Sequence, residues 1–408
     1  MPTRKQRPSI LFASRLWLCH GLLDGSIPDA QRCQSGGDLV AQRIGYDGRM
    51  QSTIARRIER ELGMAGLVDA LASKLSASDL RSILMEVFRD RSAGVKEAEI
   101  RAQALRDPLM APSAVSARDL IAFDSVAFQV ASEFAALDLS PVCPFSAAAT
   151  LGGTSQNNVV TAIRNAEALG DPTISLALEA VRRRPAAALV RLCASHRVIR
   201  LQPFDVPGYS PHFRVFALVT AGRDTGSLRF ETANLVDHVR IYLRIFRLLT
   251  DVGFAFRNPL VEFADMLAIE ETLDAAGVTR EEIRKSVRAH RLGGSERFLR
   301  ERGVVALPDA HHPHLEADVI ASLRDEFPEA EFRVNQRRLE GLGYYCSFTL
   351  RISPQAPDGN RYPIVDGGFT DWTARRLENR KERLLISGIG TEFVCKTYRR
   401  SASSAGSA

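Results

Sequence analysis

Apolar and polar side chains alternate along three segments near the end of the chain, and this pattern constrains the fold more than any other feature. The segments are 331–335, 345–352 and 383–388; a turn-rich stretch, 354–362, and a pair of glycines at 367 and 368 lie between the last two. Alternation with a period of two places successive side chains on opposite faces of a β-sheet. The sequence therefore predicts an antiparallel meander, with the glycine pair in a loop.

A second set of patterns lies earlier in the chain. Alternating apolar residues predict a strand at 211–223, followed by a turn at 224–227, a returning strand at 228–231 and a helix at 234–252. Helical spacing of apolar residues predicts further helices at 51–60, 66–88, 119–134, 175–183 and 259–275. Ser76 or Ser78 is placed to cap the later part of 66–88, and Thr279 with Glu282 has the spacing of a capping box.

The composition is that of a globular protein. The chain has 408 residues, of which 45% are apolar and 25% charged, which is enough for a large core or two domains. No uninterrupted apolar run approaches the roughly 18–20 residues that span a bilayer. The cysteines are scattered and include no Cys-x-x-Cys pair, which argues against a zinc site or a disulfide framework and favours the cytoplasm.

The formal net charge of +6 would suit a polyanionic partner. Nearly all the basic residues are arginines, however, and a bias spread over the whole chain does not mark a binding face. On charge alone we do not expect a nucleic-acid partner, and the lack of a long apolar run argues against a membrane. His311, His312 and His314 surround a proline without an acidic or cysteine ligand at helical spacing, so we expect a loop there and no metal site.

Three segments, 339–352, 365–372 and 385–392, together resemble the active-site half of histidyl-tRNA synthetases. In that family an Arg-Gly-Leu-Asp-Tyr-Tyr loop opens a strand, a Gly-Gly-Arg-Tyr-Asp loop follows, and a strand-to-helix turn ends in Glu-Arg. The order and approximate spacing are the same here. The resemblance covers residues 118–396 and implies an α+β fold: a class II synthetase-like antiparallel sheet flanked by helices, with a helical N-terminal section and a helical insertion.

The same comparison divides the chain into six parts. We expect a disordered extension at 1–45, with Met50 as a second candidate start, a helical N-terminal section at 46–115, the first half of the core at 116–255, a helical insertion at 256–332, the second half of the core at 333–400 and a disordered tail at 401–408. The helix at 119–134 resembles the one that class II synthetases use at their dimer interface, which implies a homodimer. We expect no anticodon-binding domain, because the chain stops soon after the third motif.

The resemblance also implies a set of site residues. Glu167 stands near the acidic position that holds the substrate amino group, a role that suits a carboxylate. Tyr344 and Tyr345 match the tyrosine pair, and Asp371 matches the acidic position of the Gly-Gly loop. Arg223 is the candidate for the catalytic arginine that grips the α-phosphate of ATP, because a guanidinium reaches two phosphate oxygens at once. Glu231 on the returning strand and Phe393, which could stack on adenine, complete the nucleotide site.

Several charged residues of the family are replaced. The loop arginine falls on Glu340, the neighbouring aspartate on Gly343, and the arginine of the third motif on Phe393, while Phe369 and Thr370 stand where Arg and Tyr occur. Adenylation gathers negative charge on phosphate oxygens, and each lost donor costs about 3 kcal/mol of transition-state stabilisation. We therefore expect the adenylation step to be impaired.

Three functions follow as hypotheses. The first is a stand-alone paralogue of the histidyl-tRNA synthetase core that binds an amino acid or a nucleotide without charging tRNA, a variant of which resembles the regulatory subunit of ATP phosphoribosyltransferase. The second is an active ligase that uses ATP and Mg²⁺ to adenylate another amino or carboxylic acid, for which Arg223 and Glu167 are the supporting residues. The third is an interaction protein with a relic pocket.

Overall fold

The computed structural model describes residues 53–201, 210–279, 282, 301–304 and 311–400, and the chain divides into two compact units. One unit contains 24–102 and 162–165; the other contains the rest. The helices of the N-terminal section are α1 (Thr53–Leu62), α2 (Leu67–Asp69), the π-helix η1 (Ala70–Lys74), α3 (Ala77–Ala93) and α4 (Glu97–Arg106). The Ser76 side chain caps α3 by accepting a hydrogen bond from the Asp79 N–H at 3.1 Å, which confirms one of the two predicted caps.

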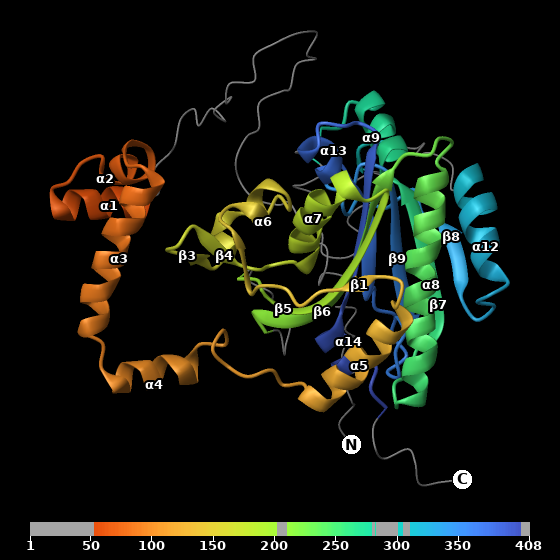
Figure 1. Ribbon diagram of the computed structural model, residues 1–408, viewed down its shortest axis with the longest axis horizontal. Helices are drawn as coiled ribbons and strands as arrows, with labels where there is room; N and C mark the ends of the chain where they lie inside the picture. Colours follow the sequence, from red (N-terminus) through yellow and green to blue (C-terminus); the bar gives the residue numbers. More distant parts are fainter. Residues whose placement is uncertain (1–52, 202–209, 280–281, 283–300, 305–310, 401–408) are drawn as a thin grey trace, which may run out of the picture. The chain divides into compact units, whose positions relative to one another are not determined.

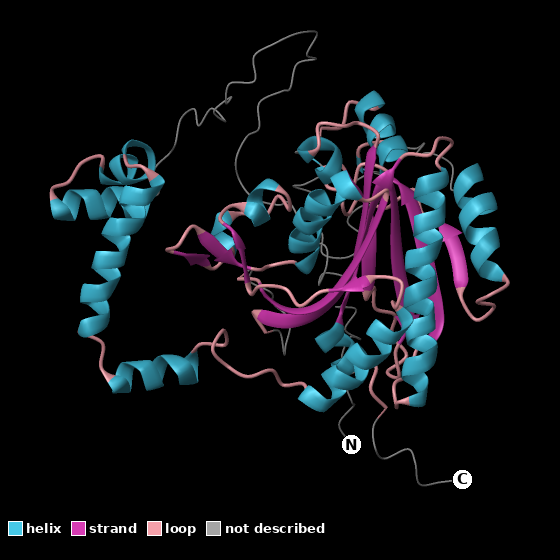
Figure 2. Cartoon of the chain, viewed as in Figure 1, coloured by secondary structure: helices cyan, strands magenta, loops and turns pink. Residues whose placement is uncertain are grey.

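The larger unit is built on an eight-stranded sheet (Figure 2). Its strands, in spatial order, are β1 (Ala135–Ala136), β5 (Leu189–Ile199), β6 (His212–Arg223), β11 (Glu382–Gly390), β10 (Val365–Thr370), β9 (Phe348–Gln355), β7 (Arg257–Asp265) and β8 (Glu331–Val334). The six inner strands are antiparallel to one another, and each of the two edge strands pairs in parallel with the inner strand beside it. The predicted antiparallel sheet flanked by helices is confirmed. A smaller sheet has the order β2 (Val142–Pro144), β4 (Ala166–Ala168), β3 (Thr161–Ala162).

Both faces of the large sheet are covered, and each strand alternates between them (Figure 1). One side, which we call the α8 face, carries α5 (Ala117–Val130), α8 (Arg229–Asp251), the π-helix η4 (Leu315–Ile320), α12 (Ala321–Arg324) and α14 (Thr391–Thr397). The other side, the α7 face, carries α7 (Pro172–Arg183), α9 (Met266–Ala275), α13 (Trp372–Arg376) and the short helices α6 (Ala147–Thr150), η2 (Gln156–Asn158) and η3 (Arg184–Ala186).

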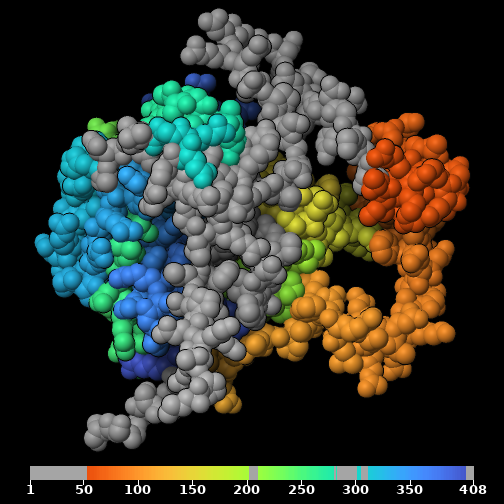
Figure 3. All heavy atoms as spheres, turned by 180° about the vertical axis from the view of Figure 1, so that it is seen from behind, coloured from red at the N-terminus to blue at the C-terminus, as the bar shows by residue number. Residues whose placement is uncertain are grey.

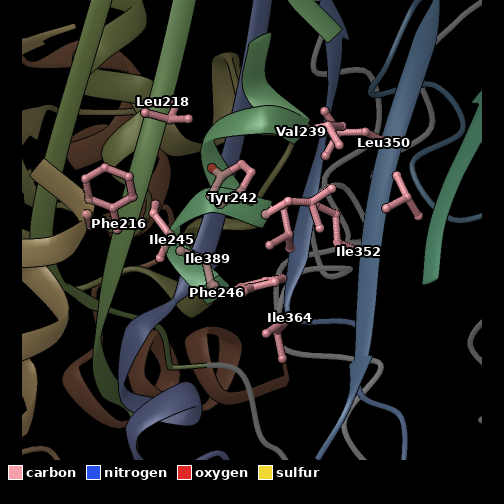
Figure 4. Close-up of a cluster of buried hydrophobic side chains, with 14 of the residues drawn as sticks. Phe216, Leu218, Val239, Tyr242, Ile245, Phe246, Leu350, Ile352, Ile364 and Ile389 are labelled. Carbon is pink, nitrogen blue, oxygen red and sulfur yellow. The ribbon is translucent and has the colours of Figure 1, made fainter. Parts of the chain in front are cut away.

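The core of the α8 face is apolar and continuous. Phe216 and Leu218 of β6 point toward Tyr242 and Phe246 of α8, with Ile352 of β9 further along the sheet (Figure 4). The segment formed by η4, α12 and β8 lies on the surface beside α8 (Figure 3), where Glu326 and Glu329 pair with arginines of that helix.

The strand predicted at 228–231 is wrong. Ser227 and Leu228 adopt positive φ angles, and α8 begins at Arg229, because Phe230 and Leu235 continue the apolar stripe that packs on the sheet. The strand, loop, strand and helix unit therefore consists of β5, the connection 200–211, β6 and α8.

Two further predictions need correction. The segment 256–332 is not wholly helical, because Val261 and Phe263 face one core and Ala264 faces the other in β7, an inner strand of the sheet. Helix begins only at α9. Gly367 and Gly368 do not form a loop but lie within β10, where both pair with β9 and β11.

Other local predictions are confirmed. The strands predicted at 211–223, 331–335, 345–352 and 383–388 are present, with shifted ends. The Thr279–Glu282 capping box is also confirmed, since each backbone N–H donates to the other side chain.

A polar cluster lies within the α8-face core. The His238 ring is fully buried and hydrogen-bonded through Nε2 to Thr220 Oγ1 at 2.9 Å and through Nδ1 to Ser387 Oγ at 2.8 Å. Tyr242 Oη lies 3.0 Å from the same Ser387 hydroxyl. Burial, helped by the charge of Arg191, lowers the pKa of His238 to about 3, so the imidazole is neutral in the folded protein.

We predict that His238 makes the protein less stable as the pH is lowered below about 6.5. The unfolded imidazole takes up a proton near pH 6.5, whereas the folded one stays neutral down to about pH 3. Between these values the unfolded state binds more protons, so the free energy of unfolding decreases by up to about 1.4 kcal/mol for each unit by which the pH is lowered. Urea unfolding of the wild type and of His238→Gln should be compared at pH 6.5, 5.5 and 4.5. The wild type should lose more stability than the variant over this range; parallel losses would show that the folded imidazole titrates normally.

Candidate functional site

The loop before β9 places a tyrosine ring on the α7 face of the sheet. A Cβ atom built on Gly368 would lie 2.6 Å from Cδ1 of Tyr345, and one built on Gly341 would lie 2.6 Å from Cδ2 of the same ring. Both distances are far shorter than a carbon–carbon contact, so the ring fits only because both positions are glycine. Gly368 is therefore needed because it leaves room for the Tyr345 ring, and not because it forms a flexible turn.

Tyr345 belongs to a buried network. Its hydroxyl donates to Asp366 Oδ2 at 3.0 Å, and Arg338 donates to Asp366 Oδ1. The Arg338 guanidinium also lies 5.8 Å from the centre of the Tyr345 ring. Burial and the Asp366 charge hold the pKa of Tyr345 well above its usual value, so the phenol stays protonated and acts as a donor.

The strand register extends this network into a row of residues across the sheet. Glu262, Arg351, Asp366, Gly388, Ala217 and Ala194 are successive partners on neighbouring strands. Arg351 lies 3.6 Å from a Glu340 carboxylate oxygen, and its Nη2 is buried without a hydrogen-bond partner. Burial alone would raise the pKa of Glu262, but the hydrogen bonds and charges of Arg333, Arg351 and Asn335 lower it overall. One half of the row is thus charged, and the other half is made of small side chains.

A second group of buried polar residues meets this face where α7 begins. Asp171 is the N-cap of α7 and accepts hydrogen bonds from the Thr173 N–H and hydroxyl, each at 2.8 Å. Arg200, which follows β5, donates to Gly170 O at 2.7 Å and to Asp171 at 3.3 Å. The Tyr344 ring packs edge-on against Tyr345 and Trp372, with centroids 4.8 and 5.7 Å apart. Burial, followed by the Asp171 charge, raises the pKa of Tyr344 well above its usual value, so this phenol stays protonated.

Of the residues predicted for the site, Tyr344 and Tyr345 lie on the α7 face, as described above. Glu167 lies in β4 of the smaller sheet, where its side chain is completely buried and its hydrogen bonds are used within the protein. Its carboxylate accepts N–H donors from Ser146 at 2.9 Å, from Ala148 at 2.7 Å and from Gln156 at 3.1 Å. These contacts hold the start of α6 and the η2 turn against the smaller sheet.

Arg223 and Asp371 lie at one end of the sheet. Arg223 is exposed at the end of β6, where its partner on β11 is Glu382. The register of β5 with β6 puts Arg223 and Arg200 at opposite ends of that ladder. Asp371 follows β10, is about half exposed and pairs with Arg375 one helical turn later at 2.9 Å.

Glu231 and Phe393 lie on the α8 face, across the sheet from Tyr345. Glu231 is in the first turn of α8, not on a strand, and accepts a hydrogen bond from Arg383 at 2.6 Å. Phe393 lies in α14 and packs edge-on against Tyr362 with ring centres 5.4 Å apart.

Asp171, Thr173 and Arg200 were not predicted from the sequence as site residues. The signal for the first two was present, because an Asp-Pro pair before an apolar helix marks an N-cap followed by proline at the first helical position. Arg200 was missed because the strand 189–199 was not recognised, so the strand–loop–strand unit was placed one strand too late.

The three histidines near residue 312 contact different carboxylates. His311 lies 2.9 Å from Glu316, His312 3.5 Å from Asp265 and His314 2.9 Å from Asp318. Across the described ranges, no group of three or more His, Cys, Asp or Glu side chains is placed to bind a metal ion. Over the same residues, no helix is long and apolar enough to cross a membrane.

Solved structures of synthetase-like proteins share this fold. A histidine–tRNA ligase subunit from Alicyclobacillus acidocaldarius superposes with a TM-score of 0.52 at 14% identity over 71% of this chain and 96% of that one. An ATP phosphoribosyltransferase regulatory subunit/histidyl-tRNA synthetase from Bacillus halodurans C gives 0.51 at 11% identity over 70% and 82%. Histidyl-tRNA synthetase from Nostoc sp. PCC 7120 gives 0.51 at 12% identity over 71% and 74%. No family model and no curated protein sequence matches the chain. The larger unit therefore has the class II synthetase-like fold, at identities that show the fold alone.

We predict that Gly368→Ala destabilises the protein by about 1–3 kcal/mol, the usual cost of overpacking, because the new methyl group meets the Tyr345 ring. Gly170→Ala is the matched control in the same unit: its nearest contact, Ile199 O, is 3.4 Å away. Denaturant unfolding followed by tryptophan fluorescence would compare the two variants, because Trp372 packs beside Tyr344. Equal stability of the variants would mean that the ring does not lie against β10.

Proposed function

We propose that this chain is a cytoplasmic, stand-alone relative of the histidyl-tRNA synthetase core that binds an amino acid on the α7 face and does not charge tRNA. The observation that supports it is the group formed where α7 meets the sheet by the buried residues Asp171, Thr173 and Arg200 and the partly buried Tyr344. An ammonium group requires a carboxylate and hydroxyl acceptors, and Asp171, Thr173 and Tyr344 are of that kind. Histidyl-tRNA synthetases hold the substrate amino group with a Glu-x-Thr loop before a helix. Asp171 likewise stands two residues before Thr173 at the start of α7, whereas Glu167 lacks this spacing.

The charges around the site disfavour a bound triphosphate. Three guanidinium groups, those of Arg333, Arg338 and Arg351, lie beside three carboxylates, those of Glu262, Asp366 and Glu340. Each cation is therefore neutralised locally, and no excess positive charge faces the sheet at this row. Phosphoryl chemistry depends on such an excess at the transition state. Of the other residues predicted to hold the nucleotide, Phe393 and Glu231 lie on the opposite face, and Arg223 lies at the far end of β6.

An amino-acid site without adenylation is suited to sensing. The Bacillus halodurans neighbour is described as an ATP phosphoribosyltransferase regulatory subunit/histidyl-tRNA synthetase, and we propose the regulatory type of role for this chain. We also propose a homodimer formed through α5, where Ile121 is 62% exposed although Leu120 and Phe123 on the same helix are buried.

The alternative is an ATP-dependent ligase for a different amino or carboxylic acid. Arg200 and the unsatisfied Nη2 of Arg351 favour it, since both could contact an anionic group. If ATP binds, these two arginines would hold its phosphates, and Mg²⁺ would supply the remaining positive charge. Amino-acid-dependent exchange of pyrophosphate into ATP, measured over a panel of amino acids, would establish this activity and overturn the sensing proposal.

The binding proposal is tested by thermal-shift titration with histidine and the other amino acids, with and without ATP and Mg²⁺. A ligand at 100 times its Kd stabilises the folded state by about 2.7 kcal/mol, which is readily measured. We expect an amino acid to stabilise the wild type, and Asp171→Asn to weaken its binding by at least tenfold, since a lost charged hydrogen bond costs about 1.5–3 kcal/mol.

Asparagine is as good an N-cap as aspartate, so this variant should keep α7. Asp371→Asn is the control, because it removes the same charge from a half-exposed residue of the same unit. Unchanged amino-acid affinity in Asp171→Asn would place the site elsewhere, and the absence of a shift with any amino acid would favour an interaction protein with a relic pocket.

A further inference from the structure

Several chain segments bring arginines to one end of the large sheet. β6 ends there at Arg223, β11 begins there at Glu382, and these two residues are register partners. Leu189 at the start of β5 pairs with Gly222, so the end of α7 and the η3 turn reach the same end. The α13–β11 connection joins them through the Asp224 N–H, which donates to Lys381 O at 2.8 Å. Figure 1 shows α13 and the start of α8 at this end of the sheet.

The exposed side chains of these segments are predominantly basic. We call the exposed basic residues of segments 179–189, 222–231 and 371–383 the basic edge: Arg182, Arg223, Arg229, Arg375, Arg376, Arg380 and Lys381. The exposed acidic residues of the same segments are Asp371 and Glu378. The surface therefore carries a clear excess of positive charge, which raises the local potential for a polyanion.

The other carboxylates of this end are already paired: Glu179 binds Arg182 and Arg183, and the rest bind arginines outside the basic edge. Glu382 binds Arg184 through two hydrogen bonds of 2.8 and 2.9 Å, and Glu231 and Asp224 both bind Arg383. In the part of the chain that the structure describes, no carboxylate lies within 4 Å of the side-chain nitrogens of four members of the basic edge. These are Arg223, Arg376, Arg380 and Lys381. Their charges are available to an external partner.

The kind of partner follows from what surrounds these cations. Protein interfaces are anchored by aromatic and apolar side chains, and single-stranded nucleic acid is held by exposed aromatic rings. The aromatic residues of these segments, Phe230 and Trp372, are buried, and the large exposed apolar residue is Leu189. Guanidinium groups match phosphate geometry, and a duplex presents its phosphates without requiring its bases to be read.

We propose that the basic edge binds the phosphate backbone of double-stranded nucleic acid, independently of base sequence and separately from the amino-acid site. The charge of the whole chain did not predict such a partner, because it does not show where the arginines gather. The folded sheet gathers them from segments that are distant in sequence, and the internal ion pairs remove the competing carboxylates from the surface.

The experiment is fluorescence anisotropy of labelled RNA and DNA duplexes of mixed sequence, titrated with the full chain between about 50 and 200 mM NaCl. We compare the wild type with a variant carrying Arg223→Gln, Arg376→Gln, Arg380→Gln and Lys381→Gln. The matched control carries Arg118→Gln, Arg257→Gln, Arg324→Gln and Arg337→Gln, which are exposed arginines of the same unit. The two variants have the same net charge, so a general charge effect would change both equally.

We expect the basic-edge variant to lose more than about 100-fold in affinity at low salt, and the slope of log K against log salt to become shallower by roughly three to four, because each phosphate contact contributes about one to that slope. The control should keep most of the affinity. Absence of duplex binding by the wild type, or an equal loss in both variants, would refute the proposal. Displacement of the duplex by polyglutamate at equal charge would identify the surface as a site for acidic proteins instead.

Discussion

The structure depends on the burial of both faces of β6 and β11, two neighbouring inner strands of the large sheet. Neither strand has a face exposed to solvent over most of its length, so alternate side chains must fit two different cores. On the α8 face, large residues such as Phe216 and Leu385 pack beneath a long helix. On the α7 face the same strands carry Val219, Leu384 and Ile386, and also the small residues Ala217, Ala221 and Gly388. Where these small residues lie, the backbone comes close to what covers it, and buried side chains there have little freedom to move.

That constraint also determines where polar chemistry can occur. Polar groups buried on the sheet must have partners, and on the α7 face the partners come from neighbouring strands or from the ends of α7 and of the Tyr344–Tyr345 loop. Arg338, Asp366 and Tyr345 satisfy one another, and so do Asp171 and Thr173. A triphosphate would need each guanidinium to leave its carboxylate, which exposes an unpaired buried charge.

Much of the scaffold was predictable from sequence because strands and helices are local patterns. Alternation located β6, β8, β9 and β11, and the Tyr344–Tyr345 pair was placed on the sheet. The failures have common physical causes. Gly367 and Gly368 were assigned to a loop, because sequence does not show that a ring packs against one glycine and Ser387 against the other. β7 was taken for helix, because both of its faces are buried and the apolar residues on either side of Glu262 do not alternate with polar ones, so their spacing resembles that of a helix.

The site itself was less predictable, since it depends on pairings between distant residues. Arg200 becomes important only when β5 is recognised as the partner of β6, and Glu231 is excluded from the α7 face only when its position on α8 is known.

The distribution of charge also depends on pairings between distant residues. The net charge of +6 is a sum over the whole chain and does not show where the cations lie. On the α7 face, carboxylates neutralise the arginines of the Glu262–Arg351–Asp366 row. At the end of β6, buried carboxylates such as Glu382 and Glu231 bind Arg184 and Arg383, and other arginines are left exposed. Folding thus concentrates positive charge on a surface away from the residues proposed to bind a small molecule, because ion pairs form between residues that the sequence keeps far apart.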